Sequence, residues 1–308
     1  MSQRLRGVLA PVITPFHADY SPDAPRFVRH CQWLLAHGCD GLAVFGTNSE
    51  ANSLAASERM ELLERLVAAG VPASRLMPGT GCCSITETAV LTAHAVKLGC
   101  AGVLTLPPFY YKGVPEEGLF RHFSEVIQRV GDARLRLYLY HIPPVAVVPI
   151  TAGLVARLLD AYPQAVAGLK DSSGDWSNTK GLIESFGARG FDVFAGSEVF
   201  LLRTLRAGGA GCITAGANVN PHGIARVYRG WQGAEADRLQ AEADGVRAIL
   251  QGSSSMIPAL KGCVAHYGQD PAWRTVRPPL VELPEAERQS LMLALGEAGF
   301  AMPELAGE

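Results

Sequence analysis

The chain has 308 residues, of which 48% are hydrophobic and 18% are charged, and its formal net charge is −2. This composition excludes a disordered chain and favours a well-buried globular core. The charge leaves no basic surplus that would drive binding to nucleic acid or to an anionic membrane.

Short apolar segments alternate along the chain with longer amphipathic ones. The apolar segments, which we predict as strands, are Gly7–Ile13, Gly41–Phe45, Leu76–Gly79, Gly102–Leu106, Leu135–Tyr140, Val166–Lys170, Asp192–Ala195 and Gly211–Thr214. The amphipathic segments, which we predict as helices, are Ala24–His37, Ser57–Ala69, Ser84–Leu98, Glu116–Val130, Thr151–Leu159, Trp176–Phe186, Val199–Arg206 and Pro221–Gln232. The strands are apolar almost throughout, as parallel strands covered on both faces are. Eight such units favour a (β/α)8 TIM barrel, an α/β fold, over an open doubly wound sheet.

The strand pattern stops after Gln232. Helices are predicted over Ala234–Gln251, Met256–Tyr267 and Pro284–Ala298, with a loop rich in proline and charge between the last two. We therefore expect a catalytic barrel over residues 1–232. A C-terminal helical extension over residues 233–308 is expected to pack on this barrel or on a neighbouring subunit.

The start of the chain does not read as a secretory signal, because Pro11 and Pro15 interrupt its apolar stretch. No window reaches the ~18 unbroken apolar residues of a membrane span. The seven cysteines are an odd number, scattered through predicted strands and helices. These features predict a cytoplasmic protein with reduced thiols.

In a barrel of this kind the active site lies at the carboxyl ends of the strands. The polar residues at those ends are Thr14, Thr47, Tyr140, Lys170, Ser197, Glu198 and Thr214. Lys170 follows the apolar run at residues 165–169 and is expected to point into the barrel mouth. Desolvation there disfavours the ammonium form, which predicts a neutral amine able to attack a carbonyl. A solvated lysine just past a strand end is the alternative.

Tyr140 ends the strand that begins at Leu135. Alternation puts the three leucines of this strand on one face and Arg136, Tyr138 and Tyr140 on the other. A phenol beside an amine could move protons during imine formation, although a packed aromatic is the alternative. The small residues of the loop at 46–50 would let backbone N–H groups approach an anion such as a carboxylate.

Five segments together resemble the dihydrodipicolinate synthase and N-acetylneuraminate lyase family. They are VLAPVITPF at 8–16, GTNSE at 46–50, LPPFYYKGVPEEGLFRHF at 106–123, YLYHIPP at 138–144 and GLKDSSGD at 168–175. The last two resemble the family motifs Y-N-x-P and G-x-K-[DE]-x-[ST]-G-[DN]. The resemblance implies a lyase of the class I aldolase type, which forms a Schiff base with pyruvate or another 2-keto acid without a metal or other cofactor. It also implies a homotetramer built as a dimer of dimers.

The resemblance implies catalytic roles for particular residues. Lys170 would form the Schiff base, and Tyr140 would be the general acid and base. Thr47 would link Tyr140 to a second tyrosine in a proton relay. That tyrosine is Tyr110 or Tyr111, because the loop carries one extra residue and the register stays open.

The resemblance also implies residues that bind the substrate. Asn48 would face the carboxylate of the keto acid, and Ile213 would offer its backbone carbonyl. Ser197 and Glu198 match the zone where sugar-acid lyases bind polyhydroxy chains, although a glutamate in a first helical turn is also favoured by the helix dipole. His141 stands where the family usually has asparagine, and it either contacts substrate or packs.

One departure leaves the second substrate open. Dihydrodipicolinate synthases carry an arginine near the position of Val145 for the carboxylate of the aldehyde substrate, and valine cannot supply that bidentate contact. The candidates are a sugar-derived 2-keto-3-deoxy acid, 4-hydroxy-2-oxoglutarate, a sialic acid or aspartate semialdehyde. The alternative functions are a genuine 4-hydroxy-tetrahydrodipicolinate synthase, a 2-keto-3-deoxy sugar acid dehydratase and a non-catalytic barrel that binds keto acids.

A metal-dependent barrel hydrolase is a further rival. The eight histidines lie at 17, 30, 37, 94, 122, 141, 222 and 266 and form no close pairs of the kind found at a strand-end metal site. Cys82 and Cys83 are adjacent, which is too tight for a zinc motif. We therefore expect no metal.

Overall fold

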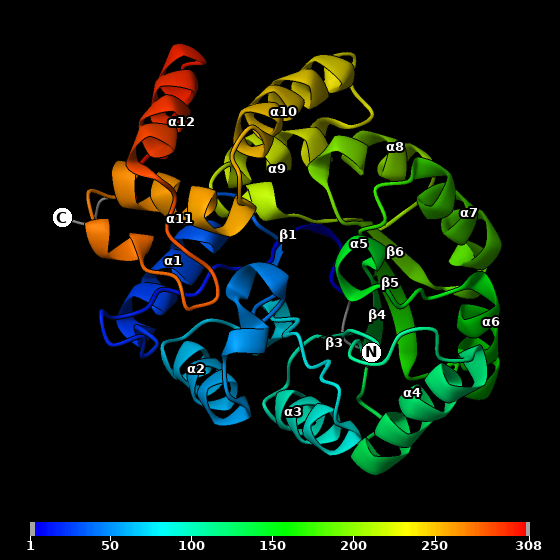
Figure 1. The fold of residues 1–308 in the computed structure, drawn as a ribbon. Coiled ribbons are helices and arrows are strands. Elements are labelled where there is room, and N and C mark those ends of the chain that lie inside the picture. The colour runs from blue at the N-terminus through cyan, green and yellow to red at the C-terminus, as the bar shows by residue number, and fades with distance from the viewer. Residues whose placement is uncertain (1–3, 306–308) are drawn as a thin grey trace.

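A parallel sheet lies at the centre of the molecule and is surrounded by helices in the computed structural model, which describes residues 4–305 (Figure 1). The strands are β1 (Gly7–Ala10), β2 (Gly41–Leu42), β3 (Val103–Thr105), β4 (Leu137–His141), β5 (Val166–Asp171), β6 (Asp192–Ala195) and β7 (Gly211–Ile213). They run side by side in the order β2-β1-β7-β6-β5-β4-β3, with every pair parallel. Neighbouring strands in the chain are thus neighbours in space, as in a TIM barrel.

The predicted third strand closes the ring between the two ends of this sheet. It pairs through isolated parallel bridges, which join Leu42 to Leu76 and Gly79 to Leu104. Pro78, which lies between the bridged residues, has no N–H to donate, so a continuous ladder does not form. Eight strands were predicted, and eight segments form the ring, although the third segment pairs through isolated bridges and is not a regular strand.

Helices cover the outside of the ring (Figure 1). They are α1 (Ala24–Ala36), α2 (Ala56–Ala68), α3 (Ile85–Lys97), α4 (Glu116–Val130), α6 (Ala152–Ala161), α7 (Trp176–Phe186), α8 (Leu201–Arg206) and α9 (Pro221–Gly230). The short helix α5 (Pro143–Ala146) instead lies over the strands in the middle of the view (Figure 1). The extension contributes α10 (Ala236–Gln251), α11 (Met256–Tyr267) and α12 (Glu285–Glu297). Within residues 4–305, none of the helices combines the length and hydrophobicity that a membrane crossing demands.

Strand side chains alternate between two apolar clusters. The inside of the barrel is filled by Leu9, Ala43, Met77, Leu104, Tyr138, Tyr140, Ala167, Phe194, Ala210 and Ile213. Leu137 and Leu139 belong to the larger cluster between the sheet and the helices. The alternation predicted for residues 135–140 is therefore confirmed.

Two glycines leave room for Tyr138 below the barrel mouth. A Cβ on Gly102 or on Gly168 would lie 2.7 Å from the ring of Tyr138. The ring itself is 1% exposed and packs at an angle against Phe194, with centroids 6.0 Å apart. These bulky side chains close the barrel beneath the strand ends.

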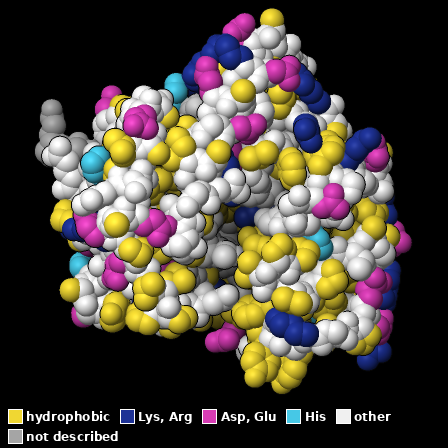
Figure 2. All heavy atoms as spheres, turned by 45° about the horizontal axis from the view of Figure 1, so that its top comes forward, with side chains coloured by type: hydrophobic (Ala, Val, Ile, Leu, Met, Phe, Trp, Pro, Cys, Tyr) yellow, Lys and Arg dark blue, Asp and Glu magenta, His cyan; other side chains and the backbone are white. Residues whose placement is uncertain are grey.

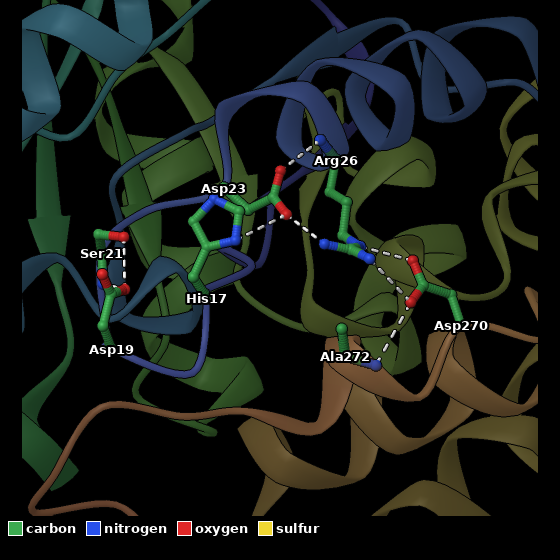
Figure 3. Close-up of polar contacts among 7 residues, drawn as sticks. All are labelled: His17, Asp19, Ser21, Asp23, Arg26, Asp270 and Ala272. Atoms are coloured by element: carbon green, nitrogen blue, oxygen red, sulfur yellow. Dashed lines mark hydrogen bonds and ion pairs between the residues drawn. The ribbon is translucent and has the colours of Figure 1, made fainter.

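A chain of ionic groups fastens the extension to the first helix of the barrel (Figure 3). Asp23 caps α1 by accepting from the backbone N of Arg26 at 3.0 Å, and His17 Nδ1 lies 3.5 Å from Asp23 Oδ2. Arg26 Nε in turn donates to Asp270 Oδ2 at 2.6 Å. Asp270 also accepts from the backbone N of Ala272, which lies in the 3-10 turn Pro271–Arg274 that follows α11. The boundary at residue 232 falls in the turn between α9 and α10, and it stays a prediction.

A second anchor is fully buried. Lys261 of α11 donates to Glu50, and both side chains have 0% exposure. Lys261 also donates to the carbonyl of Thr275 at 2.8 Å, and the backbone N of Arg277 donates to the other oxygen of Glu50 at 2.8 Å. The extension is thereby tied to the loop at 46–50, which lies at the barrel mouth.

Candidate active site

A cavity of about 530 Å³ opens at the carboxyl ends of the strands. It is lined by Thr47, Asn48, Tyr140, Ile142, Val145, Lys170, Asp171, Ser172, Gly174, Gly196, Ser197, Val199, Phe200, Ala215, Arg247, Gln251 and Met256. Figure 2 shows a hollow near the middle of one face of the molecule, and dark blue Lys or Arg atoms are visible inside it. The lining joins strand-end residues of the barrel to residues of the extension.

Lys170 lies at the end of β5 and is 4% exposed. It stands opposite Tyr140 in the register of β4 and β5. Its Nζ donates to Tyr140 Oη at 3.2 Å and lies 4.4 Å from the centroid of the tyrosine ring. The amine is therefore inside the cavity wall and beside a phenol, and it is not a solvated lysine.

The surroundings of Tyr140 lower the pKa of its phenol. Burial alone would raise the pKa of this tyrosine, but the charge of Lys170 and hydrogen bonds with Thr47, Lys170 and Ser172 outweigh burial and lower the pKa. Thr47 Oγ1 lies 3.4 Å from Tyr140 Oη. The tyrosine thus has the contacts that a proton-transfer group needs.

Ser172 was missed by reasoning from the sequence. It lies two residues after Lys170 and therefore on the same face of the extended chain, which was the available signal. Its neighbour Gly196, at the end of β6, has no Cβ, and a Cβ there would collide with Ser172 Oγ and lie 2.7 Å from the carbonyl oxygen of Asp171. The glycine leaves room for the serine beside Tyr140.

The carboxylate of Asp171 holds the end of β5 in place from the helix side. It accepts from Thr179 Oγ1 at 2.6 Å, from Asn178 Nδ2 at 3.0 Å and from the backbone N of Ser173 at 2.9 Å. These bonds tie the residue after Lys170 to α7. The position of the amine is thus fixed by a network that does not itself enter the chemistry.

Thr47 and Asn48 line the cavity from a single turn of 3-10 helix over Thr47–Ser49. The hydroxyl of Ser49 accepts from the backbone N of Gly46 at 3.1 Å. The hydroxyl of Thr14 donates to the carbonyl of Ser49 at 2.8 Å. Thr14, a strand-end candidate, therefore fastens the loop and is not part of the lining.

Five of the predicted site residues do not line the cavity, and Tyr110, Tyr111 and His141 are three of them. Tyr110 and Tyr111 are 74% and 73% exposed and pack edge-on against each other, with centroids 5.3 Å apart. Neither reaches Thr47, so the predicted relay does not form within one chain. His141 is buried on the other face of β4, where its Nδ1 accepts from the backbone N of Ile150 at 2.9 Å. It holds the loop after β4 and makes no contact with the cavity.

Four candidate residues follow or end strands β6 and β7, and the structure places them differently with respect to the cavity. Ser197 lines the cavity. Ile213 ends β7 with 0% exposure and precedes Thr214. Glu198 is 1% exposed, and one of its oxygens accepts from the Thr214 hydroxyl and from Arg247 Nη1, the latter at 3.2 Å. The carboxylate of Glu198 therefore lies behind the cavity wall rather than on it.

Arg247 of α10 is a charged lining residue that the sequence did not reveal. It stands in a segment with no motif, and the strand-end rule does not point to helices of an extension. Its side chain is 12% exposed. The cavity therefore has two cationic side chains in its lining: Lys170 comes from a barrel strand, and Arg247 comes from the C-terminal extension.

A metal centre finds no support in the part of the chain that the structure describes. Within residues 4–305, no three His, Cys, Asp or Glu side chains gather closely enough to hold an ion. All seven cysteines are free thiols. The expectation of a reaction without metal stays a prediction.

A barrel with this strand-end lysine and phenol defines an enzyme of the lyase class. The chain belongs to the dihydrodipicolinate synthetase family, whose model matches residues 4–298. An uncharacterized DapA-like lyase of Chloroflexus aurantiacus is 34% identical over 291 residues, which are 94% of this chain and 95% of that protein.

Solved structures agree with this assignment. A dihydrodipicolinate synthase from Agrobacterium tumefaciens is 32% identical, with a TM-score of 0.87 over 95% of this chain and 99% of the other. YagE of Escherichia coli K12, a prophage protein of the same family in complex with pyruvate, is 28% identical, with a TM-score of 0.87 over 96% of this chain and 99% of the other. The (β/α)8 fold and the family predicted from the sequence are confirmed.

Proposed function

We propose that the protein is a class I aldolase that forms an imine between Lys170 and a 2-keto acid such as pyruvate. The observation that carries the proposal is the amine of Lys170, which is 4% exposed and lies 3.2 Å from the phenol of Tyr140 inside the cavity. Membership of the family supports it, as does the pyruvate in the YagE complex.

In the proposed reaction the Lys170 amine attacks the keto carbon. One proton from the amine, relayed by Tyr140, and the phenol proton of Tyr140 itself convert the keto oxygen to water, whose departure leaves the protonated imine and a Tyr140 phenolate. The protonated imine then withdraws an electron pair, which allows the carbon–carbon bond β to nitrogen to break. Tyr140, as phenolate, takes the proton of the substrate hydroxyl as the aldehyde forms. The enamine is reprotonated, and water releases the keto acid and returns the amine. Condensation runs through the same steps in reverse.

Thr47 and Asn48 would bind the carboxylate of the keto acid. Both line the cavity, and their loop begins a helical turn whose backbone N–H groups suit an anion. Ile213 would offer its carbonyl at the end of β7. The protonated imine provides the electron sink, so we expect no metal or other cofactor.

Trapping with borohydride in the presence of pyruvate tests the proposal. We expect one pyruvate-derived adduct per chain in the intact mass, and peptide mapping should place it on Lys170. Lys180 of α7, which is exposed, serves as an internal control that should stay unmodified. An unmodified Lys170 would remove the mechanism. Turnover of any 2-keto acid to pyruvate would then exclude a barrel that only binds keto acids.

The assembly proposed from the resemblance is a homotetramer. Tyr110, Tyr111, Val145 and Val147 are large apolar side chains that are between 58% and 74% exposed, and an interface between copies would cover them. Lys112 joins the two segments by donating to the carbonyl of Ala146 at 2.8 Å. Light scattering of the purified chain tests this state. A cytoplasmic location remains the expectation from the reduced cysteines.

A further inference from the structure

The cavity has two cationic side chains among the described residues of its lining, Lys170 and Arg247. Lys170 is committed to the imine in the proposed function. Arg247, with Gln251 and Met256, forms the part of the lining that comes from the extension. A substrate bound to Lys170 therefore has a second cation available for the rest of its chain.

The guanidinium of Arg247 has unused donors. An arginine carries five N–H groups in a planar fork. Within the described chain, Nη1 donates to Glu198 Oε2 at 3.2 Å, and Nε is buried without a partner. Buried N–H groups are costly when left unpaired, so a fork that lines a cavity with free donors suits a ligand that completes its hydrogen bonds.

The surroundings of Arg247 hold it rigidly. Gln240, about two turns earlier on α10, accepts from the backbone N of Leu202 at 3.0 Å and donates to the carbonyl of Glu198 at 2.9 Å. These bonds fasten α10 to the turn after β6. Gly216 leaves the space that the Glu198 carboxylate fills, because a Cβ there would collide with it. Glu198 is thus a positioning residue, which orients the fork and does not itself line the cavity.

The charge of this arrangement selects the kind of ligand. Glu198 forms an ion pair with Arg247, but it accepts through a single oxygen, which the Thr214 hydroxyl also uses. The contact involves only Nη1 of the guanidinium, so N–H groups of Arg247 remain for another acceptor. A single carboxylate matches the planar fork and adds one charge. Val145, which also lines the cavity, is apolar and offers no such contact.

We propose that Arg247 binds a second carboxylate at the far end of the substrate, which makes the substrate a dicarboxylic 2-keto acid. This inference rests on the proposed function and deepens it. The keto-acid end would lie at Lys170, Thr47 and Asn48, and the distal carboxylate would lie at the extension.

The test compares two substrates that differ only at the distal end. They are 4-hydroxy-2-oxoglutarate and 4-hydroxy-2-oxopentanoate, in which a methyl group replaces the distal carboxylate. We expect kcat/KM to favour the dicarboxylate at least tenfold. Arg247→Met should lower this preference about 10- to 100-fold, mainly through KM, because a charge-assisted contact is lost. Arg238→Met is the matched control, since Arg238 lies on the same helix with a 54% exposed side chain, and it should keep the preference.

A second variant guards against misfolding of the first. Arg247→Lys keeps the charge but loses the planar fork, and it should show an intermediate preference. Added guanidinium ion should partly restore the dicarboxylate KM of Arg247→Met. An unchanged preference in both variants, or a wild-type enzyme that prefers the methyl-ended or a phosphate-ended keto acid, would overturn the inference. Borohydride trapping of pyruvate on Lys170 separates the two failures: an absent adduct in the wild type refutes the proposed function, whereas an adduct on Lys170 without the dicarboxylate preference refutes this inference alone.

Discussion

The buried pair of Lys261 and Glu50 allows a prediction of stability with a definite size. Lys261→Met removes the cation and leaves the Glu50 carboxylate at 0% exposure, with the backbone N of Arg277 at 2.8 Å as its remaining donor within the described chain. Removing one partner of a buried ion pair costs about 3–5 kcal/mol. With an unfolding entropy of about 2.1 cal/mol/K per residue, each kcal/mol corresponds to roughly 1.5 °C in a chain of 308 residues, so the melting temperature should fall by about 5–8 °C.

The measurement is thermal unfolding by circular dichroism at a fixed scan rate. The double variant Lys261→Met with Glu50→Gln should recover a large part of the loss, because the amide has no charge to bury and its oxygen still accepts from Arg277. Lys180→Met is the control, since Lys180 and Glu184 form a surface pair 3.5 Å apart that contributes at most about 1 kcal/mol. The reasoning fails if Lys261→Met is no more destabilising than the control, or if the double variant melts no higher than the single one.

Three further predictions follow from the site and the core. Tyr140→Phe should lower kcat for keto-acid cleavage about 10²- to 10⁴-fold with an unchanged circular dichroism spectrum, and a loss under tenfold would contradict a proton-transfer role. Burial lowers the pKa of His30 to about 3 from its ordinary 6.5. Between pH 6.5 and 3 the imidazole is therefore protonated in the unfolded chain but not in the folded one, so the free energy of unfolding drops by up to about 1.4 kcal/mol per pH unit over that window. The melting temperature measured from pH 7 to 4 should depend less on pH in His30→Leu than in the wild type. Gly196→Ala should displace Ser172 and lower kcat at least tenfold, whereas Gly181→Ala, with open space around it, should keep kcat and slightly raise the melting temperature.

Local sequence patterns were sufficient to locate the strands of the barrel and the pair formed by Lys170 and Tyr140. Apolar runs mark parallel strands buried on both faces, and the strand-end rule then directs attention to Lys170 and Tyr140. Their register in β4 and β5 brings the amine and the phenol together. The irregular third strand is also explained by its sequence, since Pro78 removes a donor from the ladder.

Other parts of the site depend on packing between distant segments, which periodicity does not encode. Arg247 reaches the cavity because α10 is fastened to the turn after β6, and this contact joins residues far apart in the chain. Glu198 was expected to meet substrate hydroxyls, but its contact with Arg247 and Thr214 turns it behind the wall. Tyr110 lies on a loop whose conformation is not set by any strand or helix, and its exposure could not be predicted from the motif.

The packed barrel below the strand ends has a kinetic consequence. Tyr138, with Gly102 and Gly168 making room for its ring, blocks passage through the barrel, so reactants and products share one opening. If the keto acid is bound covalently to the deeper Lys170, the aldehyde fragment must depart first during cleavage and arrive last during condensation. In cleavage assays, pyruvate should then inhibit competitively against the keto-acid substrate, and the aldehyde should inhibit noncompetitively. This pattern is the signature of ordered product release from a barrel that is open at one end.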